Sequence, residues 1–193
     1  MTNEEKIFAA FHEAGHALLY YLLGYNIQSI IVDNAGSGRV NVNACTPTMQ
    51  FTDETRLANS MTKFAYKCLS GYSAEYKYRK MRITGVPLFN SKNSNENDYN
   101  RLWIEMHNAN KLINKNRYDL FWLYLMFQDT RKIIRGKHEW RAITELSNYI
   151  IQKNDLVIDG DVVDNIFDKH VESGTLLRKL SNNRNKINKQ NSK

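Results

Sequence analysis

The sequence predicts a mainly α-helical α+β protein with a small β-sheet near its N-terminus. Apolar residues recur every three or four positions in several long segments, which is the spacing of amphipathic helices. Two short β-like segments stand together between residues 27 and 44, and only two prolines interrupt the 193 residues. No linker-like stretch divides the chain. We therefore expect one domain over residues 1–175, followed by a basic, disordered tail over residues 176–193.

The first helix is predicted between Thr2 and Gly24. Thr2 and Glu5 have the spacing of a capping box, which satisfies free N–H groups at a helix start. Gly24 is a typical residue at a helix end. Between them the apolar residues follow helical intervals, namely Ile7, Phe8, Phe11, Ala14, Leu18, Leu19 and Leu22.

A β-hairpin is predicted next. Residues 27–32 are rich in branched apolar side chains, which favour strands. Residues 39–44 alternate between polar and apolar side chains, as a half-buried strand does. The Gly36-Ser37-Gly38 segment between them supplies a turn.

Helical spacing returns after Pro47 and continues along most of the chain. The polar stretch 80–95 contains Gly85, Pro87 and an Asn/Ser cluster, so we predict a long surface loop there. The predicted helices cover residues 53–69, 73–79, 96–112, 118–135, 139–153 and 161–171.

The net charge of +7 is concentrated at the C-terminal end. Six cations and no acids lie between Leu177 and Lys193, which leaves +1 for the rest of the chain. A short Asn/Lys-rich end is more typical of a solvated tail than of a binding arm. Because the chain also lacks a recognised reading element, nucleic acid is not an expected partner.

Two further patterns concern the compartment. The first five residues are acidic where a secretory signal is basic, and no stretch reaches the roughly 18 apolar residues of a membrane span. We expect a cytoplasmic protein without a membrane span. Cys45 and Cys68 stand far apart and in no CxxC pattern, so we expect two isolated buried thiols.

The segment Phe11-His12-Glu13-Ala14-Gly15-His16-Ala17 carries the clearest chemical signal. Two histidines four residues apart on a helix project from one face, so His12 and His16 can bind one metal ion. Their flank is apolar, and partly buried ring nitrogens are costly unless something binds them. Chance composition would produce such a match in only about 1% of similar chains. We therefore predict a Zn²⁺ site.

Glu13 directly follows the first predicted ligand. Zinc lowers the pKa of a bound water to about 7, and a carboxylate within hydrogen-bond reach can take its proton during attack on a peptide carbonyl. We predict that Glu13 is this catalytic general base.

Two histidines do not complete a catalytic zinc site, which usually takes three protein ligands and water. Asp98 lies four residues before Leu102, on the apolar stripe of the predicted helix 96–112. It is a candidate third ligand, although Asp98 or Asn95 can instead cap that helix. Glu75 is a second candidate, because a glutamate on a downstream helix serves in many zincins. Spacing alone leaves this choice open.

The histidine motif resembles the peptidase domain of the FtsH-like, ATP-dependent zinc metalloproteases, whose motif reads His-Glu-Ala-Gly-His-Ala. Two later segments are similar in the same order. Leu69-Ser70-Gly71-Tyr72-Ser73-Ala74-Glu75 is similar to the family's Gly-Gly-x-x-Ala-Glu segment, and Ser94-Asn95-Glu96-Asn97-Asp98-Tyr99 to its Ser-x-Asn-Asp segment. The resemblance covers roughly residues 5–170.

This resemblance implies a zincin-like metallopeptidase fold with His12, His16 and Asp98 as zinc ligands. Glu75 then becomes a structural residue or one that supports a zinc ligand without contacting the metal. The hairpin would correspond to the family's edge strand, against which an extended polypeptide substrate can lie. The implied activity is zinc-dependent endopeptidase hydrolysis of flexible or unfolded polypeptide.

The chain also departs from the family pattern. Members carry a transmembrane segment and an ATPase module before the peptidase, whereas this sequence contains no Gly-x-x-x-x-Gly-Lys-[Ser/Thr] loop. We therefore do not expect this chain to unfold substrates by itself, and a separate ATPase or a homo-oligomer is a further partner to consider. The alternative function is a metal-binding interaction module derived from a peptidase, without turnover of its own.

Overall fold

Helix α1 (Asn3–Leu22) runs through the middle of the molecule and carries the histidine motif. It ends where Gly24 takes a φ of 76°, a left-handed conformation that glycine adopts without strain, as the sequence predicts. This computed structural model describes residues 3–33, 37–43, 54–80, 96–153, 157–176 and 178–180. The predicted cap Thr2, residues 81–95 of the predicted loop 80–95, Cys45, and residues 181–193 of the predicted tail 176–193 lie outside the described residues.

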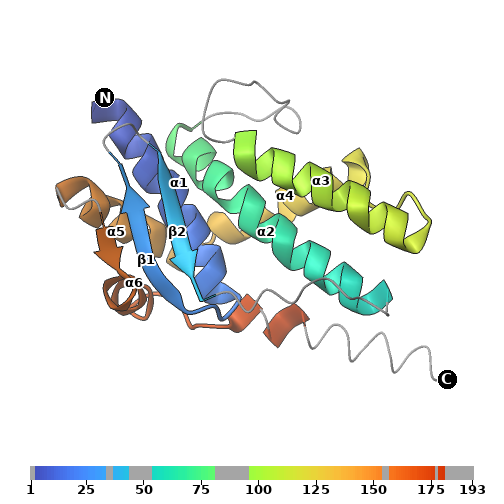
Figure 1. Ribbon diagram of the computed structural model, residues 1–193. Coiled ribbons are helices and arrows are strands. Elements are labelled where there is room, and N and C mark those ends of the chain that lie inside the picture. Colours follow the sequence, from blue (N-terminus) through green and yellow to red (C-terminus); the bar gives the residue numbers. More distant parts are fainter. Residues whose placement is uncertain are drawn as a thin grey trace.

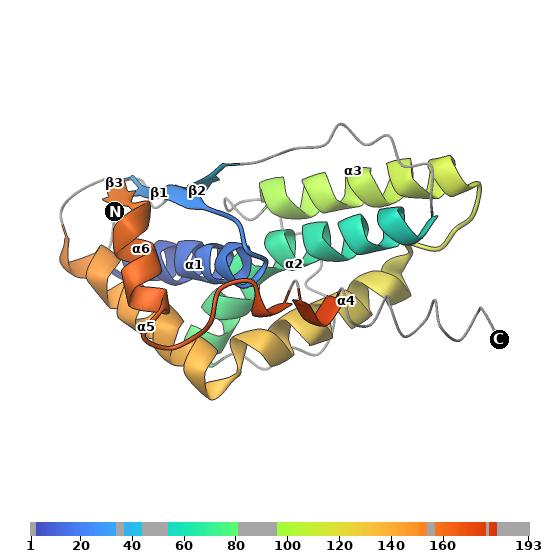
Figure 2. The ribbon, with the colours of Figure 1, turned by 90° about the horizontal axis from the view of Figure 1, so that it is seen from below.

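A three-stranded antiparallel sheet covers one side of α1 (Figures 1 and 2). The predicted hairpin is confirmed as β1 (Ile27–Val32) and β2 (Gly38–Val42). The third strand, β3 (Val157–Asp159), pairs with the other edge of β1. The sheet order is therefore β2-β1-β3, and β2 has a strand neighbour on one side only among the described residues.

The third strand corrects the prediction of a purely N-terminal sheet. Three residues are too few to show an alternating pattern, so β3 leaves no signal in the sequence. Gly160, which follows β3, lies against the backbone of β1. A Cβ at this position would overlap the carbonyl oxygen of Ile27, so a residue without a side chain is needed here. Helix α6 (Gly160–Phe167) then begins at once, and it ends four residues before the predicted limit at 171.

The remaining helices pack on α1 either directly or through α2. The two segments predicted at 53–69 and 73–79 form one continuous helix, α2 (Glu54–Tyr78), so the expected break near Gly71 was wrong. Helices at the three following predicted positions are present as α3 (Glu96–Ile113), α4 (Leu120–Ile134) and α5 (Lys137–Gln152). Helices α2 and α5 contact α1, whereas α3 and α4 contact α2.

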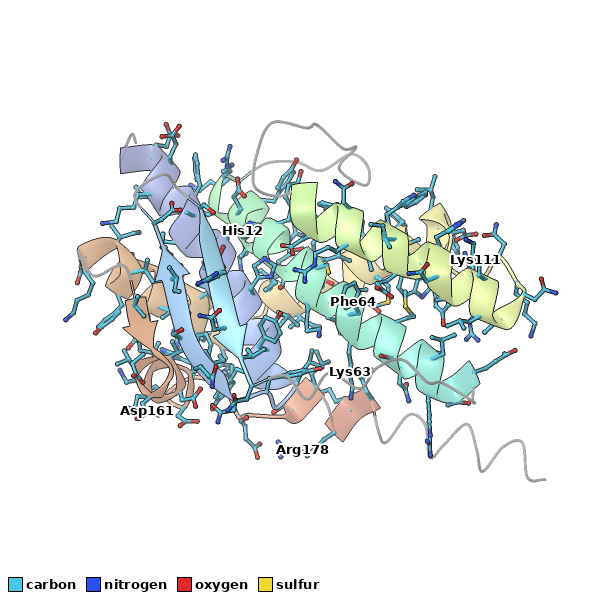
Figure 3. The ribbon with its side chains drawn as sticks, viewed as in Figure 1. His12, Lys63, Phe64, Lys111, Asp161 and Arg178 are labelled. Carbon is cyan, nitrogen blue, oxygen red and sulfur yellow. The ribbon has the colours of Figure 1, made fainter. Side chains whose placement is uncertain are left out.

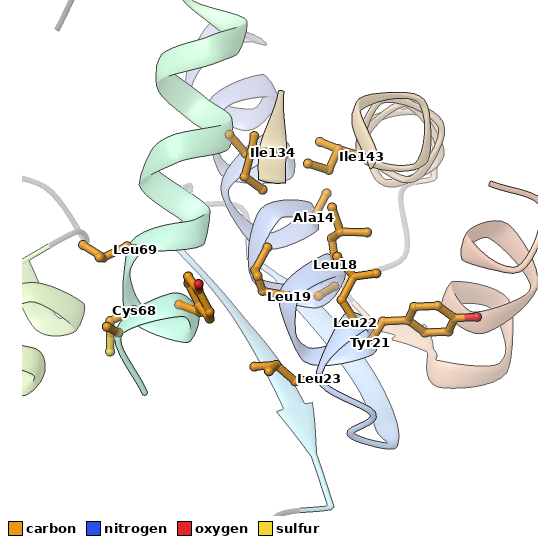
Figure 4. Packing of buried hydrophobic residues seen from close by; sticks show 14 of the residues in the cluster. Ala14, Leu18, Leu19, Tyr21, Leu22, Leu23, Cys68, Leu69, Ile134 and Ile143 are labelled. Atoms are coloured by element: carbon orange, nitrogen blue, oxygen red, sulfur yellow. The ribbon is translucent and has the colours of Figure 1, made fainter. Parts of the chain in front are cut away.

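The core surrounds α1 on nearly every side. Figure 4 shows Ala14 and Leu18 pointing toward Ile143 of α5, while Tyr21 reaches α6, where its ring meets Phe167 edge-on. Leu18 and Ile143 are fully buried. This burial holds the histidine face of α1 in a fixed orientation toward α2. The architecture is α+β, as predicted, and no helix among the described residues has the length and apolar character to cross a membrane.

Candidate metal centre

Three side chains from two helices converge at one point. His12 and His16 lie one turn apart on α1, and Asp98 lies in the first turn of α3. The two Nε2 atoms are 2.9 Å apart. The Asp98 Oδ2 atom is 2.9 Å from Nε2 of His16 and 3.8 Å from Nε2 of His12. Among the described residues, this trio is the group of potential ligands within 4.8 Å of one another.

These separations fit a small tetrahedral ion. Donors about 2.0–2.1 Å from a tetrahedral zinc stand about 3.3 Å from one another. The three observed distances, 2.9, 2.9 and 3.8 Å, scatter around that value. Two imidazole nitrogens and one carboxylate oxygen also match a catalytic zinc set, which leaves one position open.

The backbone of α2 passes directly beneath the two imidazole rings. A Cβ on Gly71 would come 2.5 Å from Nε2 of His16 and 2.7 Å from Nε2 of His12. Any side chain here would therefore crowd an ion shared by both nitrogens. Figure 3 shows His12 between α1 and α2, where this close approach takes place. The glycine inside α2 thus forms the floor of the site.

The His16 ring is held in its orientation by a hydrogen bond at Nδ1, the ring nitrogen that faces away from the other potential ligands. Its Nδ1 atom lies 2.7 Å from the carbonyl oxygen of Lys67. A carbonyl only accepts, so Nδ1 carries the proton and donates it. The lone pair of neutral His16 is then on Nε2, the atom that faces His12 and Asp98.

The Nδ1 atom of His12 faces a carboxylate and not a backbone carbonyl. This nitrogen lies 3.6 Å from Oε2 of Glu75 and has no hydrogen-bond partner among the described residues. Glu75 also forms an ion pair of 2.6 Å with Arg79, which holds the carboxylate on this side of the ring. Glu75 therefore lies outside the ligand trio and in a position to orient His12.

Glu13 projects into the same cleft as the three potential ligands. Glu13 is only 5% exposed, and a Cβ on Gly38 of β2 would collide with the Glu13 carboxyl group. Burial raises the pKa of Glu13, while the His12 and His16 rings oppose this shift. The absence of a side chain at Gly38 thus leaves room for a carboxyl group beside the metal ligands.

The ligand cluster favours positive charge at its centre. Burial acts to lower the pKa of His12, but the carboxylates of Asp98, Glu75 and Glu13 outweigh it and raise the pKa to about 10. Burial acts to raise the pKa of Asp98, yet the two imidazoles pull it well below its usual range. A divalent cation can satisfy the same carboxylates in place of that proton.

The cleft has a volume of about 400 Å³ and walls from four elements. Strand β2 forms one wall, and the opposite side consists of α2 and α3. Three cationic side chains line it, which are Arg39, Lys67 and Arg101. Burial lowers the pKa of Lys67.

The sequence alone predicts some of these residues and not others. The motif points to His12, Glu13 and His16, and the structure brings all three to one cleft with Asp98. The backbone carbonyl of Lys67 has no signature, because every residue type carries one. Gly71 appears in the quoted Leu69–Glu75 segment, but the pattern does not reveal that it contacts the imidazoles.

Compared with known proteins, the chain matches no protein-family model and no curated protein sequence.

Proposed function

We propose that this protein is a zinc-dependent endopeptidase in which His12, His16 and Asp98 hold the metal. The observation that carries the proposal is the convergence of three ligand atoms at separations of 2.9–3.8 Å above a glycine, with a buried glutamate in the same cleft. A purely structural zinc site has no use for an additional carboxyl group at an open position. The resemblance to the FtsH-like peptidase domain supports the same assignment.

Zinc, when bound, would supply a Lewis acid that polarises a peptide carbonyl and acidifies water. The protein residues supply the remaining chemistry. Glu13 accepts a proton at its carboxylate and returns it to the leaving amine, a task that the raised pKa of a buried carboxyl suits. His16, anchored by the Lys67 carbonyl, and His12, backed by Glu75, keep both Nε2 atoms directed at the ion.

The substrate would bind as an extended chain along β2. This strand lines the cleft through Gly38, Val40 and Val42 and, among the described residues, pairs with β1 on one side only. An extended peptide can hydrogen-bond to the other side by β-augmentation, which places its backbone beside Glu13. Flexible or unfolded polypeptide fits this mode because its backbone groups are free to pair.

The test is cleavage of a disordered, fluorescently labelled protein by the zinc-loaded enzyme. Glu13→Gln is assayed in parallel at equal zinc content, because it preserves the shape of the side chain and removes the base. We expect hydrolysis by the parent protein, a loss of about a hundredfold or more in the variant, and inhibition of the parent by chelation.

Two results would count against the proposal. Retained hydrolysis in Glu13→Gln would refute the assignment of the base. If neither protein hydrolyses the substrate and each has one zinc bound, the result would favour a partner-dependent or non-catalytic metal-binding module. The next experiment would then be a search for an associated ATPase.

A further inference from the structure

The cleft beside the metal centre carries a cluster of positive charge. Arg39 extends from β2, Lys67 from α2 and Arg101 from α3, and all three line the same cleft. These elements are distant in sequence and meet only in the fold. Figure 3 places His12 on α1 and Phe64, another lining residue, on the neighbouring α2.

Among the described residues, no carboxylate forms an ion pair with this cluster. Among the described residues that line the cleft, the acidic ones are Glu13 and Asp98. The Asp98 carboxylate pairs with the two histidines, and Glu13 lies beside them. In the described part of the chain, Arg39, Lys67 and Arg101 form no ion pair within 4.0 Å.

The Lys67 ammonium is held in place by aromatic rings rather than by acids. Its Nζ atom lies 5.1 Å from the ring centre of Tyr25, 5.5 Å from Phe64 and 5.7 Å from Tyr20. Cation–π contacts stabilise a charge without cancelling it. Lys67 therefore presents a cation at the wall of the cleft that has no ion-pair partner in the part of the chain that the structure describes. Arg39 and Arg101 are more exposed.

Like charges that share a partly enclosed cleft repel one another and cost free energy. That cost is offset when an anion binds between them. Ammonium and guanidinium groups bind carboxylates through short charge-assisted hydrogen bonds. A divalent ion at the metal centre would itself be positive, so it would not neutralise these three side chains.

We propose that Lys67 and Arg101, assisted by Arg39, form a carboxylate-binding subsite that selects polypeptides with a negative charge near the cleaved bond. This inference rests on the proposed peptidase function. The carboxylate has two sources, an Asp or Glu side chain and the free C-terminus of the substrate. Both present the same group, so the experiment separates them.

The probe is a fluorescein-labelled flexible peptide of about ten residues, and its binding to zinc-loaded Glu13→Gln protein is measured by anisotropy. One peptide pair has a central Glu or Gln with an amidated C-terminus. The other pair has a central Gln with a free or amidated C-terminus. We expect at least one pair to show about tenfold tighter binding of the carboxylate form, with the preference shrinking as salt is added.

Variants then locate the source of this preference. Combining Lys67→Gln with Arg101→Gln should bring the two members of the pair within about twofold. Lys63→Gln removes one positive charge from α2, as Lys67→Gln alone does, at a residue that does not line the cleft, and should keep the preference. Zinc content and thermal melting check that each variant is folded. Arg39→Gln, at an exposed position, tests the assisting residue and should reduce the preference less than the double variant does.

Each outcome decides the proposal. A preference for central Glu that the double variant loses supports a side-chain subsite, and a preference for the free C-terminus with the same loss supports a C-terminal one. Equal binding within both pairs, or a preference that survives in the double variant, overturns the subsite. Cleavage of the same peptides by the parent protein is scored separately: carboxylate-selective binding without cleavage refutes the peptidase and leaves the subsite standing.

Discussion

At the scale of single residues, a proton and a metal ion compete for His12. The surrounding carboxylates raise the pKa of this imidazole from 6.5 to about 10 in the absence of metal. A zinc ligand must be neutral, so the ion has to displace that proton. The ring that we propose as a metal ligand thus carries a positive charge in the metal-free cluster, where it stabilises the surrounding carboxylates.

This competition predicts proton release on metal binding. Titrating zinc calorimetrically at pH 8, in buffers of different ionisation enthalpy, should show release of about one proton per ion. The apparent zinc affinity should fall as the pH is lowered. His138→Gln, at an exposed histidine outside the site, should release the same proton. Zinc binding without proton release would contradict the raised pKa.

The metal-free protein should show the linked effect on stability. A folded-state pKa raised above the unfolded value contributes stability that is fully present below pH 6.5 and is lost as the pH rises toward about 10. The thermal midpoint of metal-free protein should therefore fall over this window. Zinc-loaded protein should not show the His12 contribution to that fall, because its ring is already neutral.

The residues of the site differ in how far the sequence predicts them. His12, Glu13 and His16 lie on one helix, where spacing translates directly into a shared face. Asp98 comes from a different helix, and spacing alone leaves it open against Glu75. The resemblance favours Asp98, and the structure places Glu75 on the opposite side of the His12 ring.

At the scale of secondary structure elements, two glycines let α1 and α2 approach closely. A Cβ on Gly15 would lie 2.7 Å from Cβ of Ala74 and 2.7 Å from the carbonyl oxygen of Ser70. A Cβ on Gly71 would meet the imidazoles instead. One glycine therefore serves the helix contact and the other serves the metal centre.

Matched alanine substitutions should separate these two roles. Gly71→Ala should weaken zinc binding by about tenfold to a hundredfold, because the new methyl group crowds both Nε2 atoms. Gly15→Ala should cost about 1–3 kcal/mol of stability through overpacking and change zinc affinity much less. Chelator competition and urea unfolding measure the two effects. Parental zinc affinity in Gly71→Ala would show that the close approach is not limiting.

Gly71 also explains why the sequence predicts a break in α2. Glycine inside a helix costs about 1 kcal/mol relative to alanine, so a local pattern favours ending the helix there. Packing of α2 against α1, α3 and α4 outweighs this cost. By contrast α1 and the hairpin are predicted well, because their signals are local and agree with their tertiary environment.

At the scale of the whole molecule, the segment 157–167 completes the three-stranded sheet and the hydrophobic core. It supplies β3 and four buried apolar side chains, which are Ile158, Val163, Ile166 and Phe167. Burying each such side chain is worth about 1.5–3 kcal/mol, and typical domains are stable by only about 5–15 kcal/mol. The N-terminal elements therefore depend on this late segment.

Truncation tests this dependence. A chain ending at Lys153 should lose cooperative thermal unfolding, whereas a chain ending at Leu180, which lacks only residues 181–193 of the predicted tail, should melt like the parent. Differential scanning calorimetry of both proteins measures the difference. A cooperative transition in the shorter chain would show that α1 to α5 form a stable unit by themselves.

The late position of β3 also sets an order of events during protein synthesis. The three proposed metal ligands have all been made once residue 98 leaves the ribosome, while the strand that completes the sheet follows about sixty residues later. Contacts between distant parts of a chain form slowly because they close large loops. A nascent chain thus carries all three proposed ligands before its core is complete. Metal captured at that stage would hold α1 and α3 together until β3 has been made.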